Sequence, residues 1–146
     1  MKISFLSHFI NNDTPVYGGY ENQIEISKKS SIEDGDTANS LNIILNNHVG
    51  THIDFPNHFS DTGRKSSDYE ASFWVFNKVG FIECSISEFP EKINNLPKDI
   101  ELLIFKSGFG KNRDKEIYWK SQPVIPSNFA KILRKEFPFL RVFGFD

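Results

Sequence analysis

The stretch His48–Phe59 reads HVGTHIDFPNHF and holds three of the four histidines of the chain. Gly50 lowers helix stability there, and Pro56 removes a backbone donor that a continuous helix or a central strand would need. A straight strand would separate the backbones of His48 and His52 by about 13 Å, too far for both imidazoles to reach one ion. The stretch therefore predicts a strand that bends at Gly50, where glycine permits unusual backbone torsions.

The side chains in this stretch are the ligand types of a zinc-like or manganese-like site. His48, His52 and Asp54 share the parity that places side chains on one face of a strand. Two neutral imidazoles and one carboxylate fill three positions and leave a fourth for water, as in catalytic zinc sites. A divalent ion there would lower the pKa of that water to about 7. The second oxygen of Asp54 could bridge to a second ion, and His58 is predicted either to ligate metal or to move protons.

An iron site of the two-histidine-one-carboxylate class is an alternative that part of the stretch suggests. The segment HID at residues 52–54 matches the short arm of such a site. The class needs a further, distal histidine, and no histidine follows His58. The iron oxygenase interpretation therefore lacks a ligand, and the expected metal is zinc, with manganese as the second choice.

Length and composition favour one soluble domain. The 146 residues include 25% charged residues and 15 phenylalanines, which suits a modest core. The net charge of −2, without a strongly basic half, does not indicate a nucleic-acid partner. Cys84 is the single cysteine, so a reducing compartment is the default. No apolar run approaches the roughly 20 residues of a membrane helix, and the N-terminus lacks the features of a signal peptide, so we expect a cytoplasmic protein without a membrane partner.

The hydrophobic pattern predicts a mixed α/β fold in which strands dominate and helices are few. Helical spacing is clearest in residues 127–137, with Ser127 as the expected N-cap and Pro138 directly behind the last turn. One helical turn is expected within residues 87–99, and residues 60–70 are expected to form a loop or lid. The expected strands are residues 2–10, 23–32, 41–49, 79–86, 101–107 and 140–146.

The stretch at residues 48–59 closely resembles the HxGTHxDxPxHF signature of the cyclase-like metal-dependent hydrolases, a family that includes bacterial kynurenine formamidase and isatin hydrolase. Other segments are similar to further parts of that family. ISFLSHFI resembles its opening strand, TPVYGG its P-x-W-P-G turn, LLIFKSGFG its LLRTG strand and turn, and FLRVFGFD its GVRLVGID strand. The resemblance covers nearly the whole chain, so residues 1–146 are expected to form a single cyclase-like domain.

The resemblance implies a swivelling β/β/α fold, dominated by a mixed sheet with few helices. It implies hydrolysis of an amide, often an N-formyl or cyclic one, in a small-molecule substrate. By match to the signature, His48, His52 and Asp54 would ligate the metal. His58 would act as the proton donor and acceptor.

Two aromatic residues are expected to contact substrate, the first from the resemblance and the second from its residue type. Tyr17 stands where relatives carry a tryptophan that lines the substrate pocket, and Phe59 is a further aromatic side chain suited to an apolar pocket wall.

Relatives are dimeric or larger, with pockets near the subunit interface, and a small domain with an unfinished sheet favours pairing. A homo-oligomer is therefore expected.

Members of the family continue beyond the strand that FLRVFGFD resembles, and that continuation supplies a histidine and a glutamate to the metal site. This sequence ends at Asp146, so the resemblance predicts a chain shortened at its C-terminus relative to the family. The alternative to a hydrolase is a non-catalytic fragment or pseudoenzyme of the same fold, which would bind a ligand or a partner.

Overall fold

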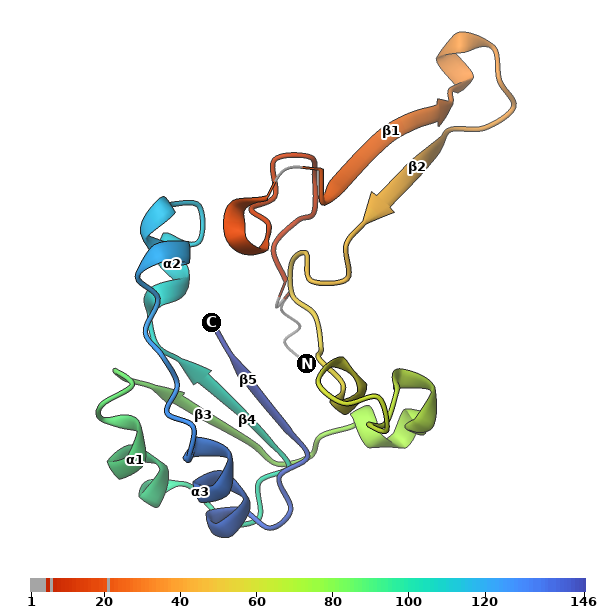
Figure 1. The fold of residues 1–146 in the computed structure, drawn as a ribbon. Coiled ribbons are helices and arrows are strands. Elements are labelled where there is room, and N and C mark those ends of the chain that lie inside the picture. The colour runs from red at the N-terminus through yellow and green to blue at the C-terminus, as the bar shows by residue number, and fades with distance from the viewer. Residues whose placement is uncertain (1–4, 6, 21) are drawn as a thin grey trace. The chain divides into compact units, whose positions relative to one another are not determined.

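The computed structural model describes residues 5, 7–20 and 22–146, and the chain divides into two compact units, Met1–Gly63 and Arg64–Asp146. The described residues form five strands in two sheets and three short α-helices (Figure 1). This arrangement confirms the predicted mixed α/β fold in which strands dominate. None of the described residues belongs to a helix long and apolar enough to cross a membrane.

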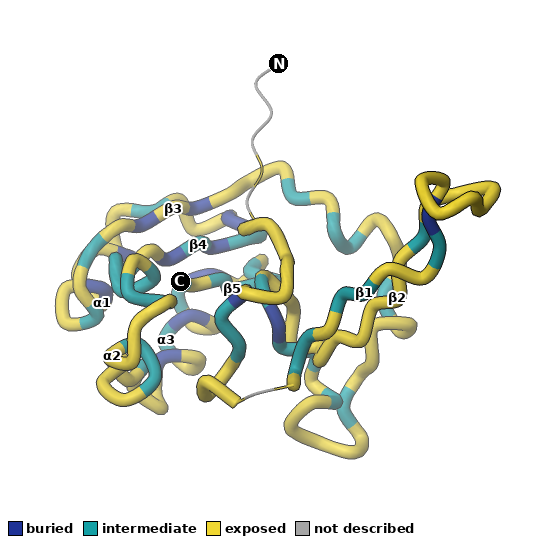
Figure 2. The backbone as a smooth tube through the Cα atoms, turned by 90° about the horizontal axis from the view of Figure 1, so that it is seen from above, coloured by how far each residue is buried: buried dark blue, intermediate teal, exposed yellow. Residues whose placement is uncertain are grey.

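The first unit is built on a hairpin of two antiparallel strands, β1 (Ile24–Ser30) and β2 (Ser40–Leu45). β-Branched side chains favour this pairing, and Ile26 of β1 lies opposite Ile43 of β2. β1 confirms the strand predicted at residues 23–32. Most of the hairpin is exposed (Figure 2).

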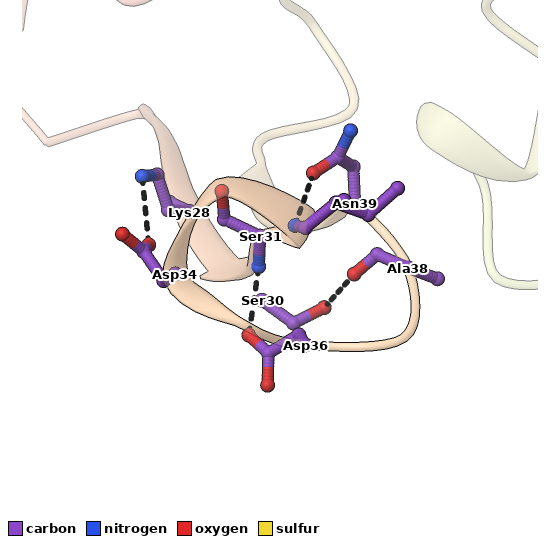
Figure 3. A network of polar contacts seen from close by, with 8 residues as sticks. Lys28, Ser30, Ser31, Asp34, Asp36, Ala38 and Asn39 are labelled. Atoms are coloured by element: carbon purple, nitrogen blue, oxygen red, sulfur yellow. Dashed lines mark hydrogen bonds and ion pairs between the residues drawn. The ribbon is translucent and has the colours of Figure 1, made fainter.

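The turn between β1 and β2 is held by side-chain oxygens that accept backbone N–H groups (Figure 3). The N–H of Ser31 donates to Oδ2 of Asp36 at 2.8 Å. The N–H of Ile32 donates to Oδ1 of Asn39 at 2.9 Å. Asp and Asn commonly stabilise turns in this way, and here they fix the register of the hairpin.

The second unit contains a parallel sheet with the strand order β3-β4-β5. Parallel neighbours require crossover connections, and helices occupy both crossovers of this unit. Figure 1 shows α1 and α3 on the same side of the sheet. The elements are β3 (Val79–Glu83), α1 (Phe89–Lys92), β4 (Leu102–Lys106), α2 (Glu116–Lys120), α3 (Phe129–Glu136) and β5 (Val142–Phe145).

The main core lies where α1 and α3 cover the sheet, and its buried residues are dark blue in Figure 2. The ring of Phe89 lies 4.6 Å from that of Phe105 on β4 and 4.1 Å from that of Phe129 on α3, measured between ring centroids. Leu133 and Phe137 follow Phe129 at four-residue intervals, so one stripe of α3 reaches the core. The helical spacing predicted from the sequence is thereby confirmed.

Asp146, directly after β5, joins this strand to the turn that follows β4. Its carboxylate accepts the backbone N–H groups of Ser107 at 2.7 Å, Gly108 at 2.9 Å and Gly110 at 3.2 Å. Burial alone would raise the pKa of this carboxyl, but the hydrogen bonds from Ser107, Gly110 and Gly108 outweigh burial and hold the pKa below its ordinary value. The contact fixes the carboxyl ends of β4 and β5 against each other.

Some local predictions are wrong. α3 has Asn128 at its N-cap with no side-chain hydrogen bond, so Ser127 is not the cap. The strand predicted at 41–49 ends at Leu45. Residues 5 and 7–10 contain no strand, and the remainder of the strand predicted at 2–10 lies outside the described residues.

Candidate metal centre

The histidine stretch leaves β2 through a turn that begins at Asn46. The side-chain Oδ1 of Asn46 accepts the N–H of His48 at 3.0 Å, and its backbone oxygen accepts the N–H of Val49 at 3.1 Å. An asparagine that bonds its own local backbone competes with a strand ladder, which explains why β2 stops at Leu45. Val49 is 3% exposed and anchors the turn. His48 therefore sits on a turn and not on the predicted strand.

The backbone bends at Gly50, as predicted. Its φ of 72° lies in the left-handed region, which costs side-chain-bearing residues free energy. A Cβ atom at Gly50 would also lie 3.2 Å from Cδ1 of Ile10. Glycine is therefore the residue that suits this position between His48 and His52.

Three potential ligand atoms converge beside this bend. Nδ1 of His48 lies 3.0 Å from Nε2 of His52 and 3.3 Å from Oδ1 of Asp54. Nε2 of His52 lies 3.8 Å from the same oxygen. Ligands held tetrahedrally at about 2.0–2.1 Å from an ion lie about 3.3 Å from one another. The triangle thus has the size that a zinc-like ion requires.

His52 is also held in the tautomer that a metal ligand needs. Its Nδ1 lies 2.9 Å from the backbone oxygen of Gly50. A carbonyl oxygen can only accept a hydrogen bond, so Nδ1 must donate and Nε2 keeps its lone pair. Metal-ligating histidines commonly donate their other ring N–H to a backbone carbonyl. Gly50 therefore both bends the chain and orients His52.

His58 lies on a single turn of 3-10 helix, Pro56–His58, that proline begins. Its ring centroid is 4.5 Å from that of His48. Ligand atoms of His48, Asp54 and His58 all lie within 4.8 Å of one another. Two possible ligand sets therefore share His48 and Asp54, completed by either His52 or His58. Both predicted roles of His58, ligand and proton carrier, are compatible with this placement.

The two residues predicted to contact substrate lie in different surroundings. The ring of Phe59 packs against that of His58, with centroids 4.5 Å apart and planes at 75°. Phe59 is 81% exposed, so its other side is open to a ligand. Tyr17 lies in another 3-10 turn, Tyr17–Gly19, and is 60% exposed. A substrate role for either residue stays a prediction.

Two residues that position the centre were not identified from the sequence. Asn46 was not separated from the strand before it, although the pair of asparagines at 46–47 is a turn signal. Gly63 is the second, because a Cβ atom there would lie 2.4 Å from the carbonyl atoms of Pro56. This close contact between the backbones of Gly63 and Pro56 sets the path of the segment that carries His58. No local sequence pattern predicts the contact.

In a comparison with family models, the chain matches the Cyclase model, described as "Putative cyclase", over residues 5–146. The comparison with curated proteins found no match. The matched range includes the histidine stretch and all five strands, and it confirms the family that the signature predicted. The chain therefore belongs to the Cyclase family.

Proposed function

We propose that this protein hydrolyses an amide in a small substrate, with His48, His52 and Asp54 holding a divalent ion. Membership of the Cyclase family indicates a cyclase-like metal-dependent hydrolase at the level of the family. The observation that carries the proposal is the triangle of ligand atoms, with edges of 3.0, 3.3 and 3.8 Å. N-formyl and cyclic amides are the substrates that the signature favours.

The donor set suits zinc or manganese. Two imidazole nitrogens and one carboxylate oxygen are ligands that both ions accept, and zinc is the first choice because three ligands with an open position are typical of catalytic zinc. When bound, the ion would supply Lewis acidity, which lowers the pKa of water to about 7 and polarises the substrate carbonyl.

The side chains of the stretch would divide the remaining work. His52, fixed by its bond to the Gly50 carbonyl, would keep a ligand nitrogen aimed at the ion. His58 would take a proton from the attacking water and deliver it to the amide nitrogen as the carbon–nitrogen bond breaks. Phe59, packed edge-on against His58, would restrict the orientation of that imidazole. Hydrolysis turns the amide and one water molecule into a carboxyl group and an amino group, with a proton of water transferred to the nitrogen. The two groups leave on separate products from an N-formyl amide and stay on one ring-opened product from a cyclic amide.

The test compares metal content and amidase rate in four proteins: the wild type, His52→Ala, His58→Ala and His8→Ala. His8 lies outside the histidine stretch and serves as the matched control. Each protein is loaded with zinc or manganese and assayed on an N-formyl aromatic amide and a cyclic amide. We expect His52→Ala to lose metal and activity together. His58→Ala should keep its metal and lose about 100-fold to 10,000-fold in rate, while His8→Ala should change neither.

Other outcomes assign the residues differently. A fall in metal content with His58→Ala would make His58 a ligand. An active His58→Ala protein with full metal content would contradict the proton-transfer role. A wild type that binds metal but hydrolyses neither amide would favour the non-catalytic alternative, a ligand-binding relative of the enzymes.

A further inference from the structure

The side chain of Ile10 lies directly over the bend at Gly50. A Cβ atom built on Gly50 would lie 3.2 Å from Cδ1 and 3.4 Å from Cγ1 of Ile10. Ile10 is 43% exposed, so one part of its side chain faces water while another part faces the bend. The two residues are far apart in the chain, so a separate segment supports the bend between His48 and His52.

Ile10 directly precedes a turn, Asn11–Thr14, that is closed by its own polar groups. Thr14 donates its N–H to the backbone oxygen of Asn11 at 3.1 Å, and Oγ1 of Thr14 accepts the N–H of Asn11 at 2.8 Å. Oδ1 of Asn11 accepts the N–H of Asp13 at 2.9 Å. Thr14 is buried, so water competes little for its hydrogen bonds. The turn therefore fixes the direction in which the chain presents Ile10.

The side chain of Asn12 attaches this turn to the hairpin. Its Oδ1 accepts the N–H of Ile26 at 2.7 Å, and its Nδ2 donates to the oxygen of Ile26 at 3.0 Å. An asparagine carboxamide can make both bonds at once because it carries an acceptor and donors side by side. Ile26 lies in β1, opposite Ile43 of β2. Two bonds to one residue fix the turn against β1 in both distance and orientation.

These contacts connect the bend back to the hairpin that it leaves. The chain runs from β2 through the turn at Asn46 to Gly50, which meets Ile10, and the turn after Ile10 is bonded to β1 through Asn12. Glycine loses more backbone freedom on folding than any other residue, so an unsupported Gly50 would sample other torsions. Support from a second segment keeps the backbone oxygen of Gly50 beside Nδ1 of His52, 2.9 Å away.

We propose that Ile10 is a positioning residue of the metal centre and that Asn12 holds it in place. Ile10 restricts the backbone at Gly50, whose oxygen then holds His52 with Nε2 free for an ion. The apparent affinity for an ion falls with the fraction of molecules whose ligands are correctly arranged. This role rests on the metal centre proposed above, because affinity for the ion is the property that it changes.

A matched pair of isoleucine substitutions tests the role through zinc affinity, measured by competition with a chelator. Ile10→Ala removes the contact with Gly50. Ile32→Ala removes the same side chain from an exposed position in the hairpin turn of the same unit. We expect Ile10→Ala to weaken zinc binding about 10-fold to 100-fold, the range typical of groups that orient metal ligands. Ile32→Ala should keep the wild-type affinity.

A matched pair of asparagine substitutions tests the attachment of the turn. Asn12→Ala removes both bonds to Ile26, so zinc affinity should fall in the same direction as in Ile10→Ala. Asn39→Ala removes a carboxamide that accepts the N–H of Ile32 in the hairpin turn, and it should leave zinc affinity unchanged. Equal affinities in the two asparagine variants would overturn the role of Asn12.

A second readout needs no metal. In metal-free protein at about pH 8, where imidazole rings are ordinarily uncharged, nitrogen NMR shifts show which ring nitrogen of His52 carries the proton. The wild type should carry it on Nδ1, whereas Ile10→Ala should show a mixture of both tautomers while the amide signals of β1 and β2 are retained. If Ile10→Ala unfolds the first unit, Ile10→Val removes Cδ1 alone and should shift the tautomers in the same direction.

The two readouts separate failure of the metal centre from failure of the support. A wild type that retains no zinc would overturn the metal centre, and the tautomer of His52 would still decide whether Ile10 orients that ring. A folded Ile10→Ala protein with the wild-type tautomer and zinc affinity would overturn the positioning role. An equal loss of zinc affinity in Ile32→Ala would also overturn it, because the loss would then follow from general destabilisation.

Discussion

At the scale of single residues, Gly50 determines how His48 and His52 are placed in the candidate metal centre. It bends the chain at φ 72° between the two histidines, and its carbonyl fixes the tautomer of His52. Gly50→Ala should cost about 1–2 kcal/mol through the left-handed backbone. If the strain is relieved by movement of the bend, zinc affinity should fall about tenfold or more, as measured by competition with a chelator.

Gly35 provides the matched control for this substitution. It has a φ of 93° in the hairpin turn, and nothing lies within 4 Å of a Cβ atom built there. Gly35→Ala should therefore cost similar stability without changing zinc affinity. Equal zinc affinity in Gly50→Ala and Gly35→Ala would mean that the bend does not determine ligand placement.

The candidate ligand residues could be selected from the sequence because imidazole and carboxylate side chains are themselves metal-ligand types. Imidazoles and a carboxylate around a glycine point to metal, and spacing alone shows that the chain must bend. The role of Asn46 could not be separated from the apolar run before it. At the end of a strand, several nearby polar side chains compete with the strand ladder for the same backbone groups, and the sequence does not show which of them forms the hydrogen bond.

At the scale of elements, the contact of Asp146 with the 107–110 turn makes stability depend on pH. The pKa of this carboxyl is lower in the folded protein than in the unfolded chain, so its contribution is present above about pH 4 and is lost as pH falls through the folded value. Asp146→Asn should lower the free energy of unfolding by about 1–2 kcal/mol at neutral pH, near the low end because the group is partly exposed.

Urea unfolding of the wild type and Asp146→Asn at about pH 7 and about pH 3 checks this expectation. The difference between the two proteins should be large at the higher pH and should shrink at the lower one. A difference that stays constant across the two conditions would show that the charge of Asp146 contributes nothing.

The aromatic cluster predicts how strongly the second unit depends on its helices. Phe89 is fully buried between Phe105 and Phe129, so Phe89→Ala should destabilise the second unit by about 3–5 kcal/mol through loss of burial and a remaining cavity. Phe139→Ala removes the same ring from a residue that is 64% exposed and should change stability by less than about 0.5 kcal/mol. Calorimetric unfolding compares the two, and similar losses would contradict this core.

The strands of the second unit and α3 could be predicted because their periodicity reflects burial on one face. β3, β4 and β5 lie within their predicted ranges, and α3 follows the spacing of Phe129, Leu133 and Phe137. α2 was missed because five residues give too little pattern. It is held by the ion pair between Glu116 and Lys120 and by contacts of Tyr118 with Phe109 and Asp146.

At the scale of the whole molecule, the two units differ in how they are stabilised. The aromatic and aliphatic core belongs to the second unit, whereas the buried residues described in the first are Thr14, Ser31 and Val49. The candidate metal centre lies wholly within the first unit. A ligand that binds only the folded state stabilises it by mass action, so a metal ion bound at this centre should stabilise the first unit against unfolding.

X-ray absorption of the zinc-loaded protein directly tests the proposal that His48, His52 and Asp54 hold a divalent ion. We predict nitrogen and oxygen neighbours only, at about 2.0–2.1 Å, with the outer-shell signature of two imidazoles in the wild type. His52→Ala should remove one imidazole or abolish binding. Failure of the wild type to retain zinc would contradict this proposal. So would a sulfur neighbour about 2.3 Å from the zinc, which would have to come from Cys84.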